Sequence, residues 1–351
     1  MHRRLPSPDT DSVEKRLPCV ALRGWIITDG KIGMDVQCRG VADALGLDYE
    51  VKHVTPSGMR GLLAPWSWPS PRERLGAPGS LLAPPWPDIA IATGRQSIPY
   101  LRKLSRLAGH ATYYVVLQDP KMGAAIADLV WVPQHDRLIG PNVIRTLTAP
   151  HSYSPARLAL LRERVPEAIA ALPRPRIAVI VGGPSGAYKF TTADGASLAQ
   201  SLRALAGLGA SFLITPSRRT PPAVLGLVDA ATRDCPRILW NGEAPNPYPD
   251  FLAHADYLVV TGDSVNMTGE ACATGRPVYV FEPVGGSAKF RRFHAALRQH
   301  GATRRLPAAP THLESWHYEP LDSACQIASE IERRIALRRR HLPAGGRFLH
   351  A

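Results

Sequence analysis

The residues best suited to chemistry lie between Asp263 and Phe281, in a stretch that is rich in hydroxyl groups and ends in a glycine–arginine–proline turn before a buried strand. Ser264 or Thr268 can cap a helix here, which leaves backbone N–H groups free to face an anion. Glu270 is expected in the first turn of that helix, where a carboxylate is favoured and can also reach the hydroxyls of a ligand. The stretch therefore suits a ribose diphosphate, although an ordinary strand–helix turn would use the same residues.

Two further segments of the second half could bind phosphate. The turn Gly182-Gly183-Pro184-Ser185-Gly186 follows a continuous apolar run; its glycines let the backbone come close to a phosphate, and Ser185 adds a hydroxyl. The turn lacks the Lys-Ser/Thr ending of a P-loop, and the dinucleotide fingerprint GxGxxG is absent. Ser217 and Arg218, with Arg219, follow another apolar run, and a guanidinium binds phosphate through two N–H groups. The alternatives are a simple glycine turn and a solvated arginine pair.

The first half offers candidates for proton transfer. Asp29 follows the first predicted strand, where a carboxylate can take the proton of an acceptor hydroxyl; it can equally cap the next helix. His135, next to Asp136, is the second candidate base, and a neutral structural histidine is the alternative. Histidine and carboxylate residues are too scattered to predict a tetrahedral metal site. Three cations at other strand ends are expected to line the same cleft: Lys31, Arg95 and Lys121.

Alternating strands and helices must position these groups. Apolar runs typical of strands cover residues 20–27, 49–54, 88–92, 112–117 and 129–132, and then 177–181, 211–215, 237–240, 258–260 and 278–281. Helical spacing covers residues 35–45, 97–107, 154–172, 197–208, 248–255 and 314–341. The alternation predicts an α/β protein with two Rossmann-like domains facing a cleft. Ligands of parallel sheets bind at the carboxyl ends of the strands, which is where the candidate residues lie.

The segment from Pro56 to Pro87 carries eight prolines, which excludes a regular helix or a central strand. We expect a long loop whose aromatic and leucine side chains either dip into a membrane interface or pack on their own domain. Arginines in the segment favour an anionic membrane surface. The residues concerned are Trp66, Trp68, Trp86, Leu62, Leu63, Leu81, Leu82, Arg60, Arg72 and Arg74.

Composition limits the classes of function. The 351 residues carry a formal charge of +13, which favours anionic partners such as nucleotides, phosphorylated substrates or acidic lipids. No nucleic-acid-binding motif accompanies the charge, so nucleic acid is not an expected partner. The five cysteines form no CxxC pair, and the chain shows neither a secretory signal nor an apolar run long enough to span a bilayer. We therefore expect a cytoplasmic protein that is at most peripheral at the inner membrane.

The linker Pro173-Arg174-Pro175-Arg176 separates the two alternations and sets the expected domain organisation. A disordered lead covers residues 1–18. A first Rossmann-like domain at 19–155, with the loop 56–87, would bind an acceptor. A connecting helix and linker at 156–175 lead to a second Rossmann-like domain at 176–312, and residues 313–351 form a terminal helix and basic tail. The oligomeric state stays open.

Two Rossmann-like halves without GxGxxG resemble the GT-B glycosyltransferases, and the chain resembles the mitochondrial-fission ELM family more closely. The matching segments fall within about residues 24–305: Thr28 to Met34, Ala92 to Arg95, Leu117 to Lys121, Pro133 to Arg137, Gly140 to Val143, Pro216 to Thr220, Asn246 to Tyr248 and Thr261 to Met267. Bacterial members of this family are described as glycosyltransferases or, loosely, as nucleoside-diphosphate-sugar epimerases. The plant namesake is described as an adaptor in organelle division.

The resemblance implies metal-independent transfer of a sugar, without a cofactor, from a nucleotide-diphosphate donor to an unknown acceptor that is lipid-linked or part of the envelope. Glu270 would hold the ribose of the donor, and Asp29 or His135 would act as base. The other donor-binding residues would be Gly182, Gly183, Ser185, Ser217, Arg218, Ser264 and Thr268. A non-catalytic adaptor of the same fold is the alternative. An epimerase fits less well, because that class needs a nicotinamide cofactor and usually a Tyr-x-x-x-Lys pair.

The enzyme hypothesis makes a geometric prediction that the adaptor hypothesis does not. Polar residues at strand ends should line one pocket between the halves. One wall would hold Asp29, Lys31, Arg95, Lys121 and His135, and the other Ser217, Arg218, Ser264 and Glu270.

Overall fold

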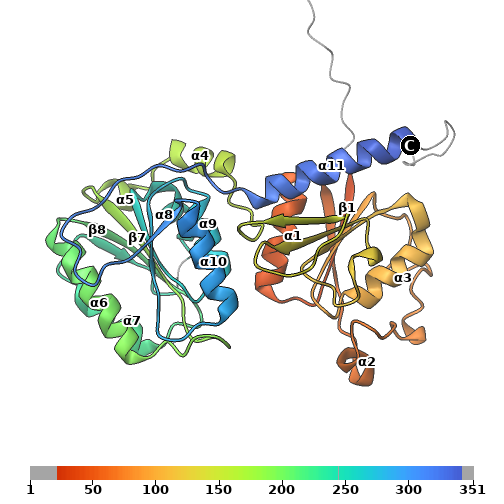
Figure 1. Ribbon diagram of the computed structural model, residues 1–351, viewed down its shortest axis with the longest axis horizontal. Helices are drawn as coiled ribbons and strands as arrows, with labels where there is room; N and C mark the ends of the chain where they lie inside the picture. The colour runs from red at the N-terminus through yellow and green to blue at the C-terminus, as the bar shows by residue number, and fades with distance from the viewer. Residues whose placement is uncertain (1–21, 244, 342–351) are drawn as a thin grey trace, which may run out of the picture.

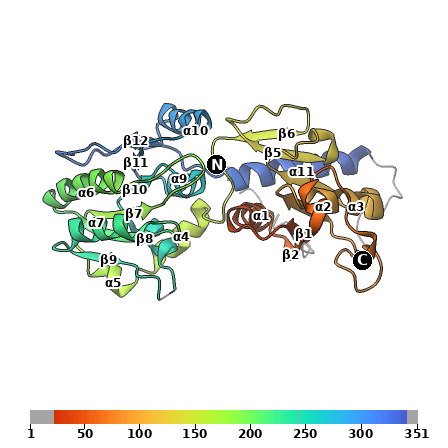
Figure 2. The ribbon, with the colours of Figure 1, turned by 90° about the horizontal axis from the view of Figure 1, so that it is seen from below.

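The computed structural model describes residues 22–243 and 245–341, so the predicted lead at 1–18 and the end of the predicted tail lie outside the described residues. Two six-stranded sheets, each parallel throughout, confirm the predicted α/β class. In Figure 1 the first half lies on the right and the second half on the left, and Figure 2 shows the same two bodies from below.

The first sheet has the strand order β2-β1-β3-β4-β5-β6. Strands β3 and β4 are buried along their whole lengths, which explains why each is a continuous apolar run. Its main helices pack on opposite faces, because Cys38 of α1 and Leu101 of α3 belong to different core clusters. The bounds are β1 (Arg23–Thr28), α1 (Ile32–Ala44), β2 (Asp48–His53), α2 (Gly58–Leu62), β3 (Ile89–Thr93), α3 (Ile98–Ala108), β4 (Tyr113–Leu117), β5 (Leu129–Pro133) and β6 (Val143–Thr146), with short 3₁₀ turns at Pro71–Glu73, Gly109–Ala111 and Ala124–Ile126.

The second sheet has the order β12-β11-β10-β7-β8-β9. Helices α6 and α7 pack on one face, where Leu198 and Val228 share a core cluster, and α8, α9 and α10 pack on the other, with Phe251 and Phe293 in a second cluster. The bounds are β7 (Arg176–Val181), α6 (Thr192–Gly207), β8 (Ser211–Pro216), α7 (Pro222–Thr232), β9 (Arg237–Leu239), α8 (Tyr248–His254), β10 (Tyr257–Thr261), α9 (Val265–Cys272), β11 (Val278–Phe281), α10 (Ala288–Gln299) and β12 (Thr303–Arg305).

Two connections join the halves. The single helix predicted over 154–172 is wrong: the structure has α4 (Pro155–Glu163) and α5 (Glu167–Ala170), because the residue before Pro166 disfavours helical geometry. The last helix, α11 (Ser323–His341), starts later than the predicted residue 314 and crosses back to the first half. Its Ile327 and Ile331 are fully buried in the same core cluster as Ile26 and Cys38.

Several other elements differ from the sequence-based expectation. The helix expected at 197–208 begins at Thr192, because Thr191 and Asp194 form a capping box in which each side chain accepts from the backbone N–H of the other. Helix α7 was not predicted; it begins at Pro222, and proline is favourable at the first helical position. Helix α10 and strands β6 and β12 were not predicted either. The segment 56–87 contains a short helix, α2, in the proline-free stretch between Pro56 and Pro65, so the prediction of no helix there is wrong.

The carboxyl ends of the two sheets face each other. Gln118, after β4, donates to Gln37 Oε1 at 2.9 Å, and Gln37 donates to Asn266 Oδ1 at 3.3 Å. Asn266, in the first turn of α9, donates to the carbonyl oxygen of Gly33 at 3.3 Å. Among the described residues, no helix is both long and apolar enough to cross a bilayer.

Candidate functional site

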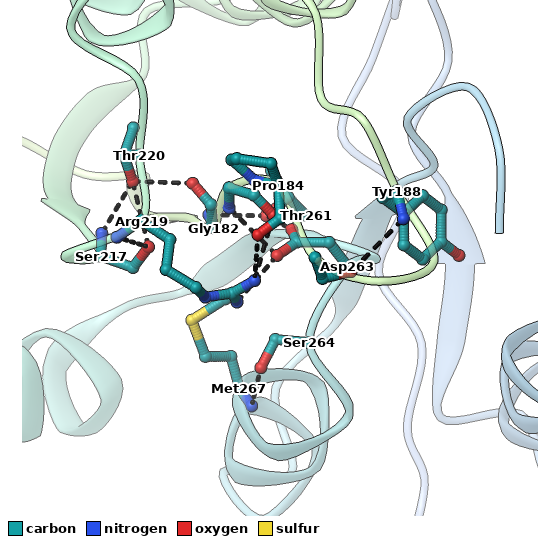
Figure 3. Close-up of polar contacts among 12 residues, drawn as sticks. Gly182, Pro184, Tyr188, Ser217, Arg219, Thr220, Thr261, Asp263, Ser264 and Met267 are labelled. Carbon is teal, nitrogen blue, oxygen red and sulfur yellow. Dashed lines mark hydrogen bonds and ion pairs between the residues drawn. The ribbon is translucent and has the colours of Figure 1, made fainter. Parts of the chain in front are cut away.

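Asp263 organises the carboxyl ends of three strands in the second half (Figure 3). Its side chain is fully buried behind the end of β10. Thr261 Oγ1 donates to Oδ1 at 2.7 Å, while the Gly183 N–H and Arg219 Nη2 each lie 3.0 Å from Oδ2. Gly182 N–H donates to Thr261 Oγ1 at 2.7 Å. One carboxylate thus fixes the glycine turn after β7 and the arginine after β8.

The two glycines of this turn are required by the protein's own packing. A Cβ atom on Gly182 would lie 2.2 Å from Asp263 Oδ1, and one on Gly183 would lie 2.0 Å from the carbonyl oxygen of Arg219. Ser185 Oγ accepts from the N–H groups of Ala187 and Tyr188, both at 3.3 Å, so its hydroxyl is used within its own turn. Internal packing and hydrogen bonds therefore explain these three residues without a ligand. Phosphate contact by Gly182, Gly183 and Ser185 stays a prediction.

The adjacent arginines after β8 behave differently. Arg219 Nη1 donates to the carbonyl oxygens of Gly183 at 3.1 Å and Pro184 at 2.9 Å, in addition to its ion pair with Asp263. Arg218 is exposed and makes no hydrogen bond or ion pair within the described part of the chain. The predicted Ser217 accepts from the Arg219 N–H and holds the turn. Arg218 is thus the guanidinium that remains available to an anion.

The N-terminus of α9 forms the next part of the same edge. Ser264 is the N-cap residue and accepts from the N–H of Met267 at 3.4 Å, which confirms the predicted cap. Thr268 lies inside the helix, is fully buried and donates to the carbonyl oxygen of Ser264, so its hydroxyl does not face solvent. The first-turn N–H groups of Val265 and Asn266 lack partners within the helix, as at every helix start.

Glu270 does not lie where the sequence predicted it. It is the sixth residue of α9 and so falls in the second turn, because the helix begins at Val265. Only 7% of its surface is exposed, and the hydroxyl of Tyr248 donates to Oε2 at 2.6 Å. Burial raises the pKa of this carboxyl group, and the Tyr248 hydrogen bond opposes that shift. A ribose would have to compete with Tyr248 for the carboxylate.

In the first half, Asp29 has one engaged and one unengaged oxygen. Its side chain is 2% exposed, Oδ2 pairs with Lys31 Nζ at 2.6 Å, and Oδ1 is buried without a partner. Gly94, at φ +84°, lies beside that oxygen: a Cβ there would be 3.4 Å from Oδ1 and 2.9 Å from Met34 Sδ. A side chain at position 94 would therefore crowd both Met34 and the carboxylate of Asp29.

His135 sits at the contact between the halves. Its ring lies edge-on to Phe293 of α10, with centroids 5.8 Å apart, and its Nε2 is buried without a partner. Burial, helped by the positive charge of Lys289, lowers the pKa of His135 to about 4. Lys289 also pairs with Asp136 at 2.9 Å. His135 is therefore neutral near pH 7, and a base with so low a pKa is weak.

Arg95 and Lys121 line a cavity of about 220 Å³ at the ends of β3 and β4. Its other lining residues also come from the first half: Met34, Gly94, Ile98, Val116, Leu117, Gln118, Asp119 and Pro120. Lys121 Nζ pairs with Asp119 at 2.7 Å, whereas Arg95 makes no ion pair among the described residues. Of the nine residues predicted to line one pocket, Arg95 and Lys121 line this cavity. Glu270 is instead buried against Tyr248.

Sequence reasoning took Arg219 for an anion donor and did not assign the other residues that hold this region together: Asp263, Asn266, Gln37, Gln118 and Tyr248. Asp263 is the second residue after the buried strand β10 and could have been found by the rule that favours strand ends. The others act through partners far away in sequence. No three His, Cys, Asp or Glu side chains are grouped as metal ligands in the described ranges 22–243 and 245–341.

Solved structures with this arrangement of sheets are known. The S. aureus MnaA–UDP co-structure matches with a TM-score of 0.51 at 10% identity, covering 92% of this chain and 98% of that one. The fold is therefore of the GT-B type, with two Rossmann-like halves. Acinetobacter baumannii MurG gives a TM-score of 0.46, and the UDP-GlcNAc 2-epimerase of Methanocaldococcus jannaschii gives 0.48. These lower scores add nothing to the assignment.

Sequence relatives identify the family. The mitochondrial fission protein ELM1 of Arabidopsis thaliana is 32% identical over 276 residues, which cover 72% of this chain. An uncharacterized protein, RP120, of Rickettsia prowazekii is 34% identical over 161 residues. The chain spans 65% of the length of the first relative and 45% of the second. The family model "Mitochondrial fission ELM1" matches residues 32–335. The chain therefore belongs to the mitochondrial fission ELM1 family.

Proposed function

We propose that this protein transfers a sugar from a nucleoside-diphosphate donor, held by the second half, to a hydroxyl acceptor held by the first. One observation carries the proposal. The carboxyl ends of the two sheets face each other. The second half brings the unpaired Arg218 and the N-terminus of α9, and the first half brings the buried carboxylate of Asp29, whose Oδ1 has no partner.

On the donor side, Arg218 and the first turn of α9 supply positive charge and N–H groups for a diphosphate. Asp263 and Arg219 fix the turn beside them and are positioning residues. Sharing a fold with a protein solved with UDP supports a uridine nucleotide as the first donor to test. Glu270 stays the candidate for the ribose, provided that the nucleotide displaces Tyr248.

On the acceptor side, Asp29 Oδ1 is the base. It takes the proton of the acceptor hydroxyl as that oxygen bonds to the anomeric carbon of the sugar, and the bond from this carbon to the diphosphate breaks. The electron pair leaves with the diphosphate, whose growing charge Arg218 and the α9 N-terminus stabilise. The cavity of Arg95 and Lys121 adjoins Asp29 through Gly94, and is the place for the acceptor.

Calorimetric titration with UDP-, GDP-, ADP- and CMP-sugars tests the donor site. We expect one of these to bind, and Arg218→Ala to weaken it about tenfold or more, because a charged hydrogen bond contributes about 1.5–3 kcal/mol. Arg203→Ala is the matched control, an exposed arginine on α6. Asp29→Asn should bind the same sugar and lose turnover. Equal affinity in both arginine variants would place the donor elsewhere.

A non-catalytic adaptor is the second candidate, because Glu270 is engaged by Tyr248 in a buried pair. The glycines at 182 and 183 also have an internal explanation, and the plant relative is named a fission protein. Failure of every nucleotide sugar to bind would favour the adaptor. Conversion of a bound sugar to its epimer without any acceptor, followed by NMR, would instead favour an epimerase.

A further inference from the structure

The short helix α2 and the turn after it present an exposed apolar cluster. Met59 is 68% exposed, Leu62 69%, Leu63 53% and Trp66 61%. Figure 1 shows α2 projecting from the body of the first half. The sequence had proposed more residues for a lipid-facing surface, but Leu82 is fully buried, and Leu81 and Trp86 pack on the core of the first half. We call Met59, Leu62, Leu63 and Trp66 the α2 cluster.

The α2 cluster is held in place by hydrogen bonds rather than left as a loose loop. Ser67 Oγ donates to the carbonyl oxygen of Arg60 at 2.7 Å, and Arg60 Nη1 donates to that of Trp68 at 3.0 Å. Arg102 of α3 donates from Nη1 to the carbonyl oxygens of Pro65 and Ser67, both at 3.3 Å. The turn after α2 is therefore fixed to α3 through Arg102, and the apolar side chains are displayed beside this fixed turn.

A group of cations lies beside the α2 cluster. The guanidinium groups of Arg102 and Arg106 each lie 4.0 Å from the centroid of the Trp68 ring. A hollow of about 410 Å³ next to Trp68 is lined by Arg74, Lys103 and Arg106. The full group is Arg60, Arg72, Arg74, Arg102, Lys103 and Arg106.

This positive charge lacks compensation from the protein. None of the six cations forms a salt bridge with another described residue. Glu73 is the acidic residue of the segment 56–87, and its carboxylate accepts from the Ser70 N–H at 2.9 Å as part of a capping box. The surface thus offers apolar side chains next to unpaired positive charge, which calls for a partner with the opposite arrangement.

We propose that this surface docks on an anionic lipid bilayer. A bilayer supplies negative headgroups above an apolar layer, so Leu62 and Trp66 can enter the headgroup boundary while the cations stay at the surface. Gly61 of α2 lies next to Gln96, because a Cβ on Gly61 would be 3.7 Å from Gln96 Nε2. Gln96 belongs to the loop that also carries Gly94 and Arg95. Docking thus brings the cavity of Arg95 and Lys121 close to the membrane; it does not depend on the proposed transfer reaction.

Flotation of the full chain with vesicles tests the proposal. We expect the protein to float with phosphatidylcholine vesicles that contain phosphatidylglycerol, to stay largely at the bottom with phosphatidylcholine alone, and to lose binding in high salt. Leu62→Asp should lower partitioning about tenfold or more, because it replaces a side chain that inserts with a charge that lipid repels. Leu160→Asp on α4 is the control, since Leu160 is 65% exposed far from the cluster.

Charge is tested separately by Arg72→Gln, which should lower binding about fivefold at low salt, with Arg203→Gln as the control. Melting temperatures of all variants show whether each is folded. The proposal is overturned if the parent fails to float with the vesicles that contain phosphatidylglycerol, or if Leu160→Asp loses as much binding as Leu62→Asp. It is also overturned if sedimentation shows a dimer that Leu62→Asp dissociates, because a second copy would then cover the α2 cluster.

Discussion

Among single residues, the contact between Tyr248 and Glu270 determines how the glutamate can act. Tyr248→Phe removes the hydroxyl that donates to a buried carboxylate, so we expect the free energy of unfolding to fall by about 1–3 kcal/mol. Urea unfolding measures it. Tyr153→Phe is the control, because Tyr153 packs edge-on against Tyr248 with ring centroids 5.6 Å apart. If the two variants unfold alike, Glu270 does not depend on Tyr248.

The sequence could predict which strand ends carry polar side chains. It could not predict which of two adjacent polar residues is left without an intramolecular partner. Asp29 and the Ser264 cap follow from local rules, because a cap or a strand end involves residues close in sequence. Arg218 and Arg219 are chemically identical, and only the turn between Ser217 and Thr220 decides that Arg219 faces Asp263. Long-range partners leave no local pattern.

At the scale of elements, two helical glycines should respond in opposite ways to the same substitution. A Cβ on Gly40 of α1 would lie 2.5 Å from the backbone carbon of His151, so Gly40→Ala forces α1 away from that segment and destabilises the protein by several kcal/mol. Gly226 of α7 has nothing within 4 Å, so Gly226→Ala should stabilise by about 0.5–1 kcal/mol. Thermal unfolding compares them; a stable Gly40→Ala protein would contradict the close approach.

Element types followed from periodicity, and element boundaries depended on contacts that periodicity does not contain. The buried strands β3, β4, β7 and β8 are long apolar runs and were found. The three-residue strand β12 was missed, because two of its three residues are exposed and only its pairing with β11 makes it a strand. The starts of α6 and α7 likewise depend on a capping box and on an N-terminal proline, which hydrophobic periodicity does not show.

Across the whole molecule, buried histidines make stability depend on pH. Burial lowers the pKa of His151 to about 4 from 6.5, and Asp322 opposes this only in part. The unfolded chain therefore binds more protons between those values, so the free energy of unfolding falls as the pH drops from about 6.5 towards 4. For His151 this amounts to about 2 kcal/mol at about pH 5. His135 adds to it, and the pKa values of His254 and His294 are also lowered by burial.

His151→Asn provides the check on this pH dependence. In the parent, the Tyr153 N–H donates to His151 Nδ1 at 3.3 Å. An asparagine cannot titrate, but its side-chain oxygen can still accept from that N–H. Urea unfolding at about pH 7.5 and about pH 5 should show a smaller difference for the variant than for the parent. The same difference in both proteins would mean that His151 does not contribute.

The return of α11 to the first half determines the order in which a growing chain can complete its parts. The core cluster of Ile26 and Cys38 needs Ile327 and Ile331, which leave the ribosome after the whole second half has been made. During synthesis the second sheet can therefore close before the first has all of its core. A gene fragment ending between the two sheets would encode a first half with an uncovered apolar face. A fragment that begins with α11 and continues into β1 would restore it, because Leu22 and Ile335 already pack in the same cluster.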